Sequence, residues 1–561
     1  MKKAKRYIIS AGVTAAAAIG LFYFTLPAIN PRDAGFWSFL VSVLVLFFVS
    51  AFFSGIPGFL KINVKKIRTV KGIELDPNQK SFKTLKRIVL IVIGFILLLI
   101  AVIFFTSSPV MHSKAYRNMV TVENSEFDKD IAELPFSRIP VLDRDSAARM
   151  GSRTLGEVVE LVSQFNAAEN YTQINYAQRP VRVTPLEYSD FFKWFVNQNE
   201  GIPYYLMIDM VTQEPKLVKL DKGIRYSPSE RFQRNLRRHV RFKYPTKMFE
   251  EFSFEIDENG HPFWVVSVYD YTIGLLGGRD ITGTILVDAV TGDTDYFKIS
   301  DVPSWVDRAY PAEMIVEQAH FWGLYTNGFW NSIIGQKGVV TTTEGYNYIA
   351  IDDDVWLYTG ITSVVTDESN IGFLMVNLRT KQTKLYSVNG AEEYSAMGSA
   401  QGKVQEKRYV ATFPILVNLA DRPTYFMSLK DNAGLVKSFA FVDVANYHIV
   451  SVADTLEAAR NEHIRLLGAE GQDEESGEQV FGSVSGIIEK ISPAVIEGNT
   501  YYYIRLSGNN AVYRAGISVS PHLPLLEAGA DTEISYIETP EDGSGSSTVI
   551  YEVVEIILIP H

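Results

Sequence analysis

Residues 88–105 read IVLIVIGFILLLIAVIFF, a run of eighteen side chains without a polar group. As an α-helix this run would extend about 27 Å, close to the thickness of the hydrocarbon core of a bilayer. Lys86 and Arg87 directly precede the run, and no basic residue follows it before Lys114. The run therefore predicts a membrane-spanning helix that separates a short amino-terminal part from the 454 residues after position 107.

Two more uncharged runs come earlier in the chain, at 7–29 and 34–60. Together with 88–107 they predict three transmembrane helices. The segment 61–87, between the second and third helices, carries nine basic and two acidic residues. Because basic loops remain in the cytoplasm, we expect this segment and the amino terminus inside the cell and residues 108–561 outside it. Cleavage of the first run as a signal peptide would leave that topology unchanged.

Charge and composition narrow the class of protein. Residues 1–107 have a net charge of +11 and the remainder has −22. A part this acidic does not attract nucleic acid, whose phosphates require the opposite field. The chain has no cysteine, which excludes disulfides, thiolate nucleophiles and Cys-ligated metals and fits the surface of a Gram-positive bacterium. The apolar runs contain no ionisable side chain, so we expect anchors rather than an ion or proton path.

A pattern recurs four times after the third apolar run. The stretches 205–217, 284–297, 373–386 and 439–450 each have a strand of buried character, then Asp or Asn, then a polar turn and a return strand. An Asp or Asn side chain accepts hydrogen bonds from backbone N–H groups two or three residues ahead, which favours a hairpin. The residues expected to form these turns are Asp209, Asp288, Asn377 and Asp443. The spacing predicts antiparallel α+β modules.

The second copy contains Val287-Asp288-Ala289-Val290-Thr291-Gly292, which resembles the closing hairpin of the PepSY module. The resemblance implies a small extracytoplasmic α+β fold. It also implies a role without catalysis, in inhibiting or regulating peptidases or in assembly at the cell surface. The whole arrangement resembles uncharacterised multi-pass membrane proteins of Firmicutes, which implies a location in the cell envelope.

One segment, SERFQRNLRRHVRFKYP at 229–245, stands out in the acidic part of the chain because it is strongly basic. Phe232, Leu236 and Val240 follow helical spacing and predict a buried stripe. The arginines flank this stripe: Arg231, Arg234, Arg237, Arg238 and Arg241. They either pair with acidic neighbours in the fold or bind an anionic partner, such as lipid headgroups, a wall polymer or an acidic protein.

Other candidate sites are weaker. Asp352-Asp353-Asp354 lacks the glycine and the downstream glutamate of a calcium loop, so we favour a solvated turn and keep calcium as the alternative. The eight histidines contain no HExxH motif. The aromatic cluster Phe191, Phe192, Trp194 and Phe195, in a helix expected over 185–198, is assigned to the core. We therefore predict no catalytic, cofactor-binding or metal-binding residue.

The carboxyl-terminal part begins with an acidic linker without large apolar residues at 468–479. Five strand candidates follow in 480–561, separated by turns rich in Gly, Asn and Pro. Five short strands in so few residues predict a small closed β-barrel of the OB or SH3-like kind.

The expected organisation is a membrane-anchored, multidomain α+β protein. Its segments are a membrane domain at 1–107, a stalk with a helical or α+β unit at 108–200, α+β repeat units one and two at 201–300, unit three at 301–390, unit four at 391–467, the linker and the barrel. The expected function is that of a non-enzymatic extracytoplasmic scaffold or regulator that binds a protein or a wall partner. The alternatives are a cell-envelope hydrolase with a site between modules and a ligand-sensing membrane protein.

Overall fold

The computed structural model describes residues 2–53, 80–132, 138–364, 369–470, 481–496, 499–516, 519–520, 523–537 and 550–558. The chain divides into two compact units, Met1–Leu467 and Gly468–His561. Most of the basic segment 61–87 and of the acidic linker 468–479 lies outside the described residues.

Three apolar helices open the first unit: α1 (Lys2–Thr25), α2 (Ala34–Phe53) and α3 (Lys80–Ser107). The first helix ends four residues before the expected position 29, because Leu26 turns the backbone into the left-handed region (φ 49°) and Pro27 follows. Among the described residues, one helical stretch, Leu97–Arg117, is long and apolar enough to cross a membrane, and Ala11–Thr25 and Ala34–Phe47 are shorter apolar helices.

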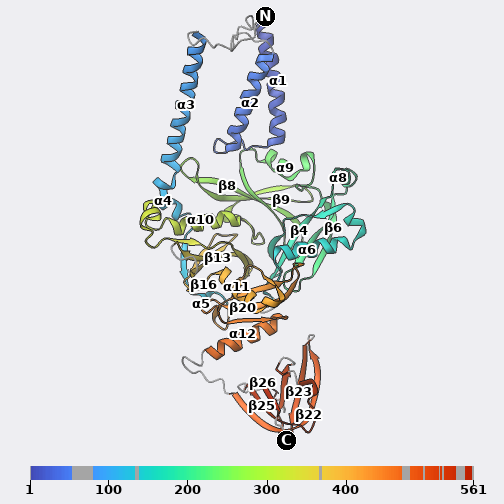
Figure 1. The fold of residues 1–561 in the computed structure, drawn as a ribbon. Coiled ribbons are helices and arrows are strands. Elements are labelled where there is room, and N and C mark those ends of the chain that lie inside the picture. Colours follow the sequence, from blue (N-terminus) through green and yellow to red (C-terminus); the bar gives the residue numbers. More distant parts are fainter. Residues whose placement is uncertain are drawn as a thin grey trace, which may run out of the picture. The chain divides into compact units, whose positions relative to one another are not determined.

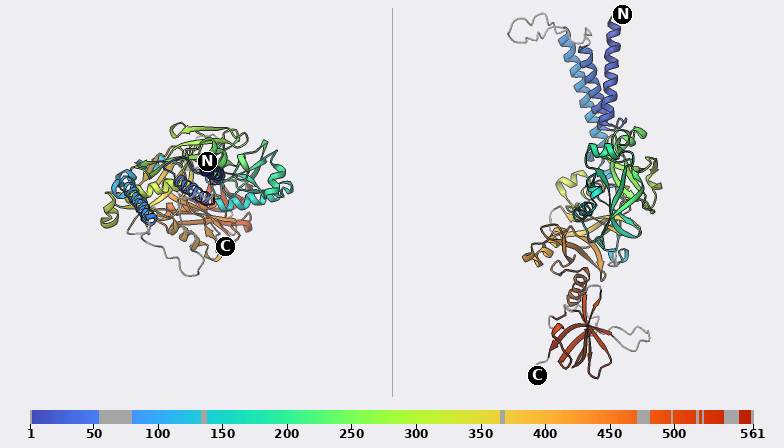
Figure 2. Two further views of the ribbon diagram at one scale, coloured as in Figure 1. Left: turned by 90° about the horizontal axis from the view of Figure 1, so that it is seen from above. Right: turned by 90° about the vertical axis from the view of Figure 1, so that its right-hand side faces the viewer.

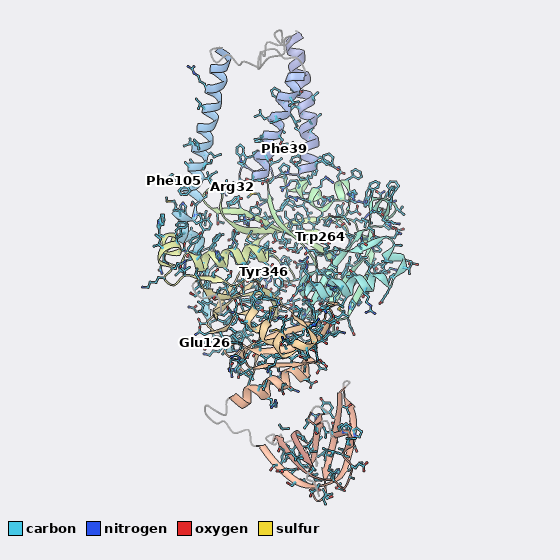
Figure 3. All side chains as sticks on the ribbon, in the orientation of Figure 1. Arg32, Phe39, Phe105, Glu126, Trp264 and Tyr346 are labelled. Atoms are coloured by element: carbon cyan, nitrogen blue, oxygen red, sulfur yellow. The ribbon has the colours of Figure 1, made fainter. Side chains whose placement is uncertain are left out.

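The carboxyl ends of α1 and α3 and the amino end of α2 meet the same side of the α+β part of the first unit (Figures 1 and 2). In the turn between α1 and α2, Arg32 forms an ion pair with Asp270 at 3.0 Å. At the end of α3, the Ser107 hydroxyl accepts hydrogen bonds from the backbone N–H groups of Leu275 and Leu276 at 2.9 and 3.0 Å. Arg32 and Phe105 mark this level in Figure 3.

The α+β part repeats one arrangement four times: a helix followed by a four-stranded antiparallel meander. The first module is α6 (Arg144–Gly156), β3 (Thr172–Tyr176), β4 (Arg179–Tyr188), β5 (Ile202–Asp209) and β6 (Pro215–Ile224). The second is α9 (Leu236–Lys243), β7 (Met248–Ile256), β8 (Pro262–Ile273), β9 (Gly277–Asp288) and β10 (Thr294–Lys298). The third is α10 (Ala312–Leu324), β12 (Asn347–Ile351), β13 (Asp354–Ser363), β14 (Ser369–Asn377) and β15 (Thr383–Tyr386). The fourth is α11 (Glu393–Lys403), β18 (Ile415–Leu419), β19 (Arg422–Lys430), β20 (Val436–Asp443) and β21 (Val450–Ala453).

Shorter elements extend these modules. Four strands lengthen the sheets of modules one, three and four: β2 (Phe165–Ala167), β11 (Val340–Thr342), β16 (Gly390–Ala391) and β17 (Val410–Ala411). The remaining helices are α4 (Pro109–Arg117), α5 (Phe127–Asp130), α7 (Val159–Val162), α8 (Phe191–Asn197) and α12 (Leu456–Glu470). Short 3₁₀ or π turns occupy Phe232–Arg234, Ile299–Asp301, Asn331–Gly335, Gln405–Lys407 and Leu523–Leu525.

Two features differ from the expected organisation. Strand β4 pairs with β5 from Val181↔Asp209 to Pro185↔Tyr205, so the first module runs across position 200 and includes the helix before it. The stretch expected to be a stalk is docked, because β1 (Val122–Ser125) pairs in parallel with β15. Both features depend on pairing between distant segments, which local sequence patterns do not encode.

The modules share their apolar cores. Val183 and Leu206 of module one lie in the same buried cluster as Phe254 and Ile285 of module two. A second cluster joins modules two and three, and a third joins modules three and four. The first unit therefore folds as one continuous body rather than as four separate domains.

The second unit is a closed five-stranded barrel with strand order β22-β23-β24-β26-β25. Its strands are β22 (Phe481–Ile496), β23 (Asn499–Leu506), β24 (Val512–Gly516), β25 (Asp531–Ile537) and β26 (Ile550–Leu558). The long β22 pairs with β25 along its first half and with β23 along its second, and β24 and β26 pair in parallel. Ile488, Ile504 and Ile534 are buried in its core.

A substitution at Gly274 tests the contact between the end of α3 and the turn from β8 to β9. The φ of Gly274 is +60°, and an added Cβ would overlap the backbone carbonyl of Thr106. We expect Gly274→Ala to lower the free energy of unfolding by about 2 kcal/mol or more. Gly402 in α11 has no atom within 4 Å of the position of an added Cβ, so Gly402→Ala should be neutral or stabilising by up to about 1 kcal/mol. Thermal unfolding of both full-length variants measures the difference, and equal midpoints would contradict the docked turn.

Candidate functional site

The recurring Asp and Asn residues form turns, as predicted. Asp209 Oδ1 accepts hydrogen bonds from the backbone of Val211 and Thr212 at 2.8 and 3.0 Å. Asp288 and Asn377 make the same pair of bonds two and three residues ahead. Asp443 accepts from the backbone of Asn446 at 2.7 Å. Each turn joins the third and fourth strands of its module, so the repeated residues stabilise the closing hairpin of each module.

The basic segment 229–245 forms helix α9 over part of its length. Leu236 and Val240 are buried, as expected, but Phe232 is 61% exposed and the prediction for it is wrong. Asn235 caps α9, since its side chain accepts from the backbone N–H of Arg238. Phe232 therefore precedes the helix, on a 3₁₀ turn with φ +50°, and leaves the helical register.

Two of the five arginines bind the end of α1. Arg241 is buried, and its guanidinium donates to the carbonyl oxygens of Leu26 at 3.1 Å and Lys247 at 2.6 Å. Arg238 lies 4.1 Å above the ring of Tyr23 and donates to the Tyr23 carbonyl at 3.4 Å. These guanidinium groups join α9 to the apolar helix.

The other three arginines lie away from α1. Arg234 pairs with the buried Glu230, at 3.5 Å. Arg231 and Arg237 are exposed, and no ion pair of their side chains is present within the described residues. The predicted patch is thus divided between three arginines with internal contacts and two exposed arginines, Arg231 and Arg237.

Glu230 also fixes helix α8. Its carboxylate accepts hydrogen bonds from the Trp194 indole N–H and the Tyr188 hydroxyl, both at 2.9 Å. Trp194 is buried, but Phe191, Phe192 and Phe195 are 50%, 75% and 60% exposed. The assignment of this cluster to the core is therefore wrong for three of its four members. Strand β4 continues to Tyr188, so the helix is shorter than expected and buries only Trp194.

A cavity of about 720 Å³ opens between the β5–β6 hairpin and the second module. Its lining includes three cationic side chains, Lys222, Arg225 and Arg234, together with Glu200 and Asp221. The lining is therefore mixed in charge, with one more cationic than anionic side chain.

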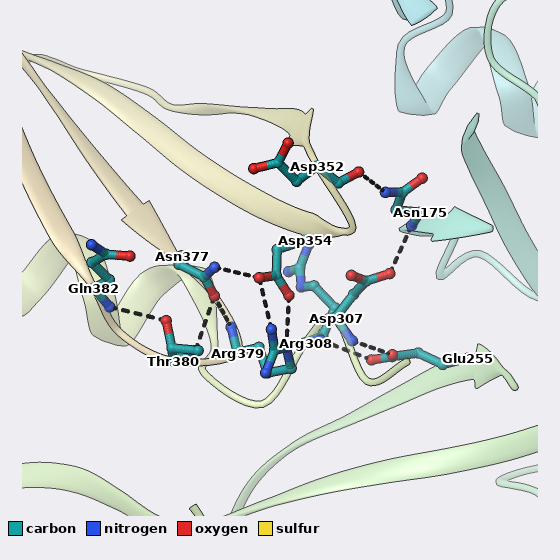
Figure 4. Close-up of polar contacts among 10 residues, drawn as sticks. All are labelled: Asn175, Glu255, Asp307, Arg308, Asp352, Asp354, Asn377, Arg379, Thr380 and Gln382. Atoms are coloured by element: carbon teal, nitrogen blue, oxygen red, sulfur yellow. Dashed lines mark hydrogen bonds and ion pairs between the residues drawn. The ribbon is translucent and has the colours of Figure 1, made fainter. Parts of the chain in front are cut away.

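Three modules meet at a cluster of buried polar groups (Figure 4). Glu255 of β7 accepts hydrogen bonds from the backbone N–H groups of Asp307 and Arg308 at 2.9 and 3.2 Å. Asp307 accepts from the backbone N–H of Asn175, in β3, at 2.6 Å. Arg308 donates to the Tyr348 hydroxyl of β12 at 3.0 Å. The cluster thereby links β strands of modules one, two and three through the segment before α10.

Burial controls the protonation of this cluster. Desolvation raises the pKa of Glu255 to about 7, although the two backbone donors and the nearby Arg308 oppose the rise. Desolvation, followed by repulsion from Glu255, raises the pKa of Asp307 well above its ordinary value. Both carboxyl groups are at most 1% exposed, and neither lines a cavity of about 720 or 310 Å³. These groups are therefore enclosed at the junction of the three modules.

The aspartate triplet forms a turn. Asp352, with φ +56°, lies in the hairpin between β12 and β13, and its carbonyl accepts from the Asn175 side chain at 2.9 Å. Asp354 accepts hydrogen bonds from Nε and Nη2 of Arg379 at 2.6 and 2.8 Å. Among the described residues, no group of three His, Asp or Glu side chains converges as a metal site.

Comparisons with known proteins identify no family. No family model matches the chain, and no curated protein matches it. A crystal structure of an ACO/RPE65 chimera aligns at 8% identity with a TM-score of 0.14, over 71% of this chain and 62% of the other. This likeness is too low to carry an argument about fold or function.

Removal of the Glu230 carboxylate should release α8. We expect Glu230→Ala to lower the free energy of unfolding by about 2–4 kcal/mol, because the Trp194 and Tyr188 donors lose their buried acceptor. The exposed pair of Glu157 with Arg153 provides the control, since Glu157→Ala should change stability by less than about 0.5 kcal/mol. Thermal unfolding and Trp fluorescence report the two variants, and an unchanged spectrum for Glu230→Ala would contradict the anchoring role.

The module junction should make stability depend on pH. A carboxyl group whose pKa is raised by folding holds its proton in the folded state when it has lost it in the unfolded state, so its contribution falls as pH rises. For Glu255 this loss spans about pH 4.5 to about 7.

Asp307→Asn tests the same relation. The amide keeps an acceptor for Asn175 and removes a buried carboxyl group whose pKa is raised by burial and by Glu255, so we expect the variant to be more stable than the wild type by roughly 1–2 kcal/mol at pH values high enough to ionise the folded carboxyl group. The advantage should shrink as the pH falls toward 3.8, the ordinary pKa of an aspartate. Unfolding midpoints measured across this range check the slope, and a constant difference at all pH values would contradict it.

Proposed function

We propose that the protein is a membrane-anchored, extracytoplasmic scaffold or regulator of the cell envelope, which binds a protein or a cell-wall partner and is not an enzyme. The observation that carries the proposal is the meeting of three apolar helix ends at one side of the α+β part. This arrangement fits three membrane spans with the modules outside and the basic segment 61–87 inside.

The polar contacts at these ends support this topology. The turn between α1 and α2 is held to the second module by the ion pair from Arg32 to Asp270. The backbone N–H of Ile29 donates to the Pro245 carbonyl at 2.7 Å. A loop that emerges from a bilayer next to a folded domain can make such contacts, whereas the opposite ends of the three helices are flanked by basic sequence.

The module architecture supports binding rather than catalysis. A helix followed by a four-stranded meander, repeated with the same closing turn, agrees with the resemblance of 287–292 to the PepSY module. The shifted carboxyl groups Glu255 and Asp307 are enclosed at a junction, where they have no access to a substrate. In the barrel, the first strand, β22, pairs with the second, β23, and the fourth, β25. The third strand, β24, is parallel to the fifth, β26. This strand order favours the OB alternative over the SH3-like one.

Cysteine accessibility tests the topology, because the natural chain has no cysteine. We expect Tyr447→Cys, at a site that is 42% exposed, to react in intact cells with a membrane-impermeant maleimide. Lys71→Cys in the basic segment should react only after the membrane is permeabilised. Labelling of Lys71→Cys in intact cells, or protection of Tyr447→Cys, would overturn the proposed topology.

Crosslinking tests the binding role. A photoreactive residue at exposed module positions, Leu435 or Val410, should capture a stoichiometric membrane, surface or wall component in intact cells. A tag after His561 allows purification and identification by mass spectrometry. Recovery of the protein alone from both positions, together with hydrolysis of cell-wall material by the purified chain, would replace the scaffold with an enzyme.

A further inference from the structure

The exposed face of α8 is an unusual surface for a folded module. Phe191, Phe192, Phe195 and Val196 are 50–75% exposed. At 100° per residue they fall within an arc of about 140°, while Trp194 points into the module. Phe232 lies beside them, with its ring 5.8 Å from that of Trp194. We call these residues the aromatic patch: Phe191, Phe192, Phe195, Val196 and Phe232.

Contacts connect the aromatic patch to the end of α1. Arg238 donates to the Phe232 carbonyl at 2.6 Å and to the Tyr23 carbonyl at 3.4 Å. Phe242, 52% exposed on the same helix α9, packs on Phe22 at 5.9 Å. Arg238 therefore bridges the last turn of an apolar helix and Phe232 of the patch, and Figure 1 shows α8 and α9 on the side of the modules that faces the apolar helices.

Charge and backbone conformation add to this surface. Arg231 and Arg237 are exposed at its edge, and Lys193 lies in α8. Phe232 holds the left-handed conformation with φ +50°, which bulky residues rarely adopt. The structure thus keeps a large apolar ring outward at a conformational cost, beside cations in an otherwise acidic part of the chain.

We propose that the aromatic patch lies in the interfacial region of the outer leaflet, with the Phe rings among the upper acyl chains and Arg231 and Arg237 on lipid phosphates. Aromatic side chains beside cations favour this zone of a bilayer. The occupant is a lipid surface rather than a protein groove partner, because Arg238 holds Phe232 of the patch next to the end of an apolar helix. The inference rests on the proposed membrane anchoring, and it adds a second contact that orients the modules against the membrane.

Single cysteines labelled with an environment-sensitive fluorophore test the proposal in the full chain. The protein is reconstituted in phosphatidylglycerol/phosphatidylcholine nanodiscs with or without brominated acyl chains. The label at Phe192→Cys or Val196→Cys should be blue-shifted and quenched by the brominated lipid. The label at Val410→Cys, at a site of module four that is 53% exposed, should remain water-like and unquenched.

A label at Leu98→Cys in α3, at a site that is 62% exposed, distinguishes a failure of the membrane anchoring from a failure of the aromatic patch proposal. If it is quenched while Phe192→Cys is not, the anchoring stands and the aromatic patch proposal is wrong. If it is not quenched, the proposed membrane anchoring itself fails. A label at Phe192→Cys that is shielded from water but insensitive to brominated lipid would show that a protein covers the patch, which also overturns the proposal.

A charge variant gives an independent check. Phe191→Asp with Phe195→Asp keeps Trp194 and its bond to Glu230, so the module should fold with an unchanged unfolding midpoint. In this background the label at Val196→Cys should lose its quenching and become water-like. Undiminished quenching would contradict a role of the rings in holding α8 at the bilayer.

Discussion

The buried guanidinium of Arg241 is the interaction on which the arrangement of the first unit depends. Within the described part of the chain no carboxylate forms an ion pair with it, and it donates hydrogen bonds to the carbonyl oxygens of Leu26 and of the residues that follow α9. Carbonyl groups at the ends of helices lack partners within the helix and carry partial negative charge. One cation therefore satisfies the ends of two helices at once. Burial lowers its pKa to about 10, so it remains charged at neutral pH.

Local patterns in the sequence predict the local features well. The apolar runs, the Asx turns and the stripe of Leu236 and Val240 all follow from spacing and from short-range hydrogen bonds. The prediction for Phe232 fails because Asn235 starts the helix three residues later than the periodicity suggests. The prediction for the aromatic cluster of α8 fails for a different reason. Its hydrophobicity indicates burial, but the helix has only seven residues, is held by Glu230 and buries only Trp194.

The candidate sites also depend on contacts that local sequence patterns do not predict. Glu255, Asp307 and Asn175 come from segments that are far apart in the chain and meet only in the fold. No spacing rule identifies such a cluster, and nothing in its local sequence distinguishes Glu255 from a solvated carboxylate. The basic character of 229–245 is visible in the sequence, but the division between internal contacts and free arginines depends on where α1 ends.

The parallel pairing of β1 with β15 has a mechanical consequence. β1 follows the apolar helices α3 and α4, and β15 leads into module four. A pull between the apolar helices and the carboxyl-terminal end of the first unit would load these two strands along their length and in opposite directions. Such a load is shared by all the hydrogen bonds of the pair at once, whereas a hairpin opened from its end breaks them one after another. The pair of β1 and β15 would therefore resist such a pull more strongly than a hairpin that opens from its end.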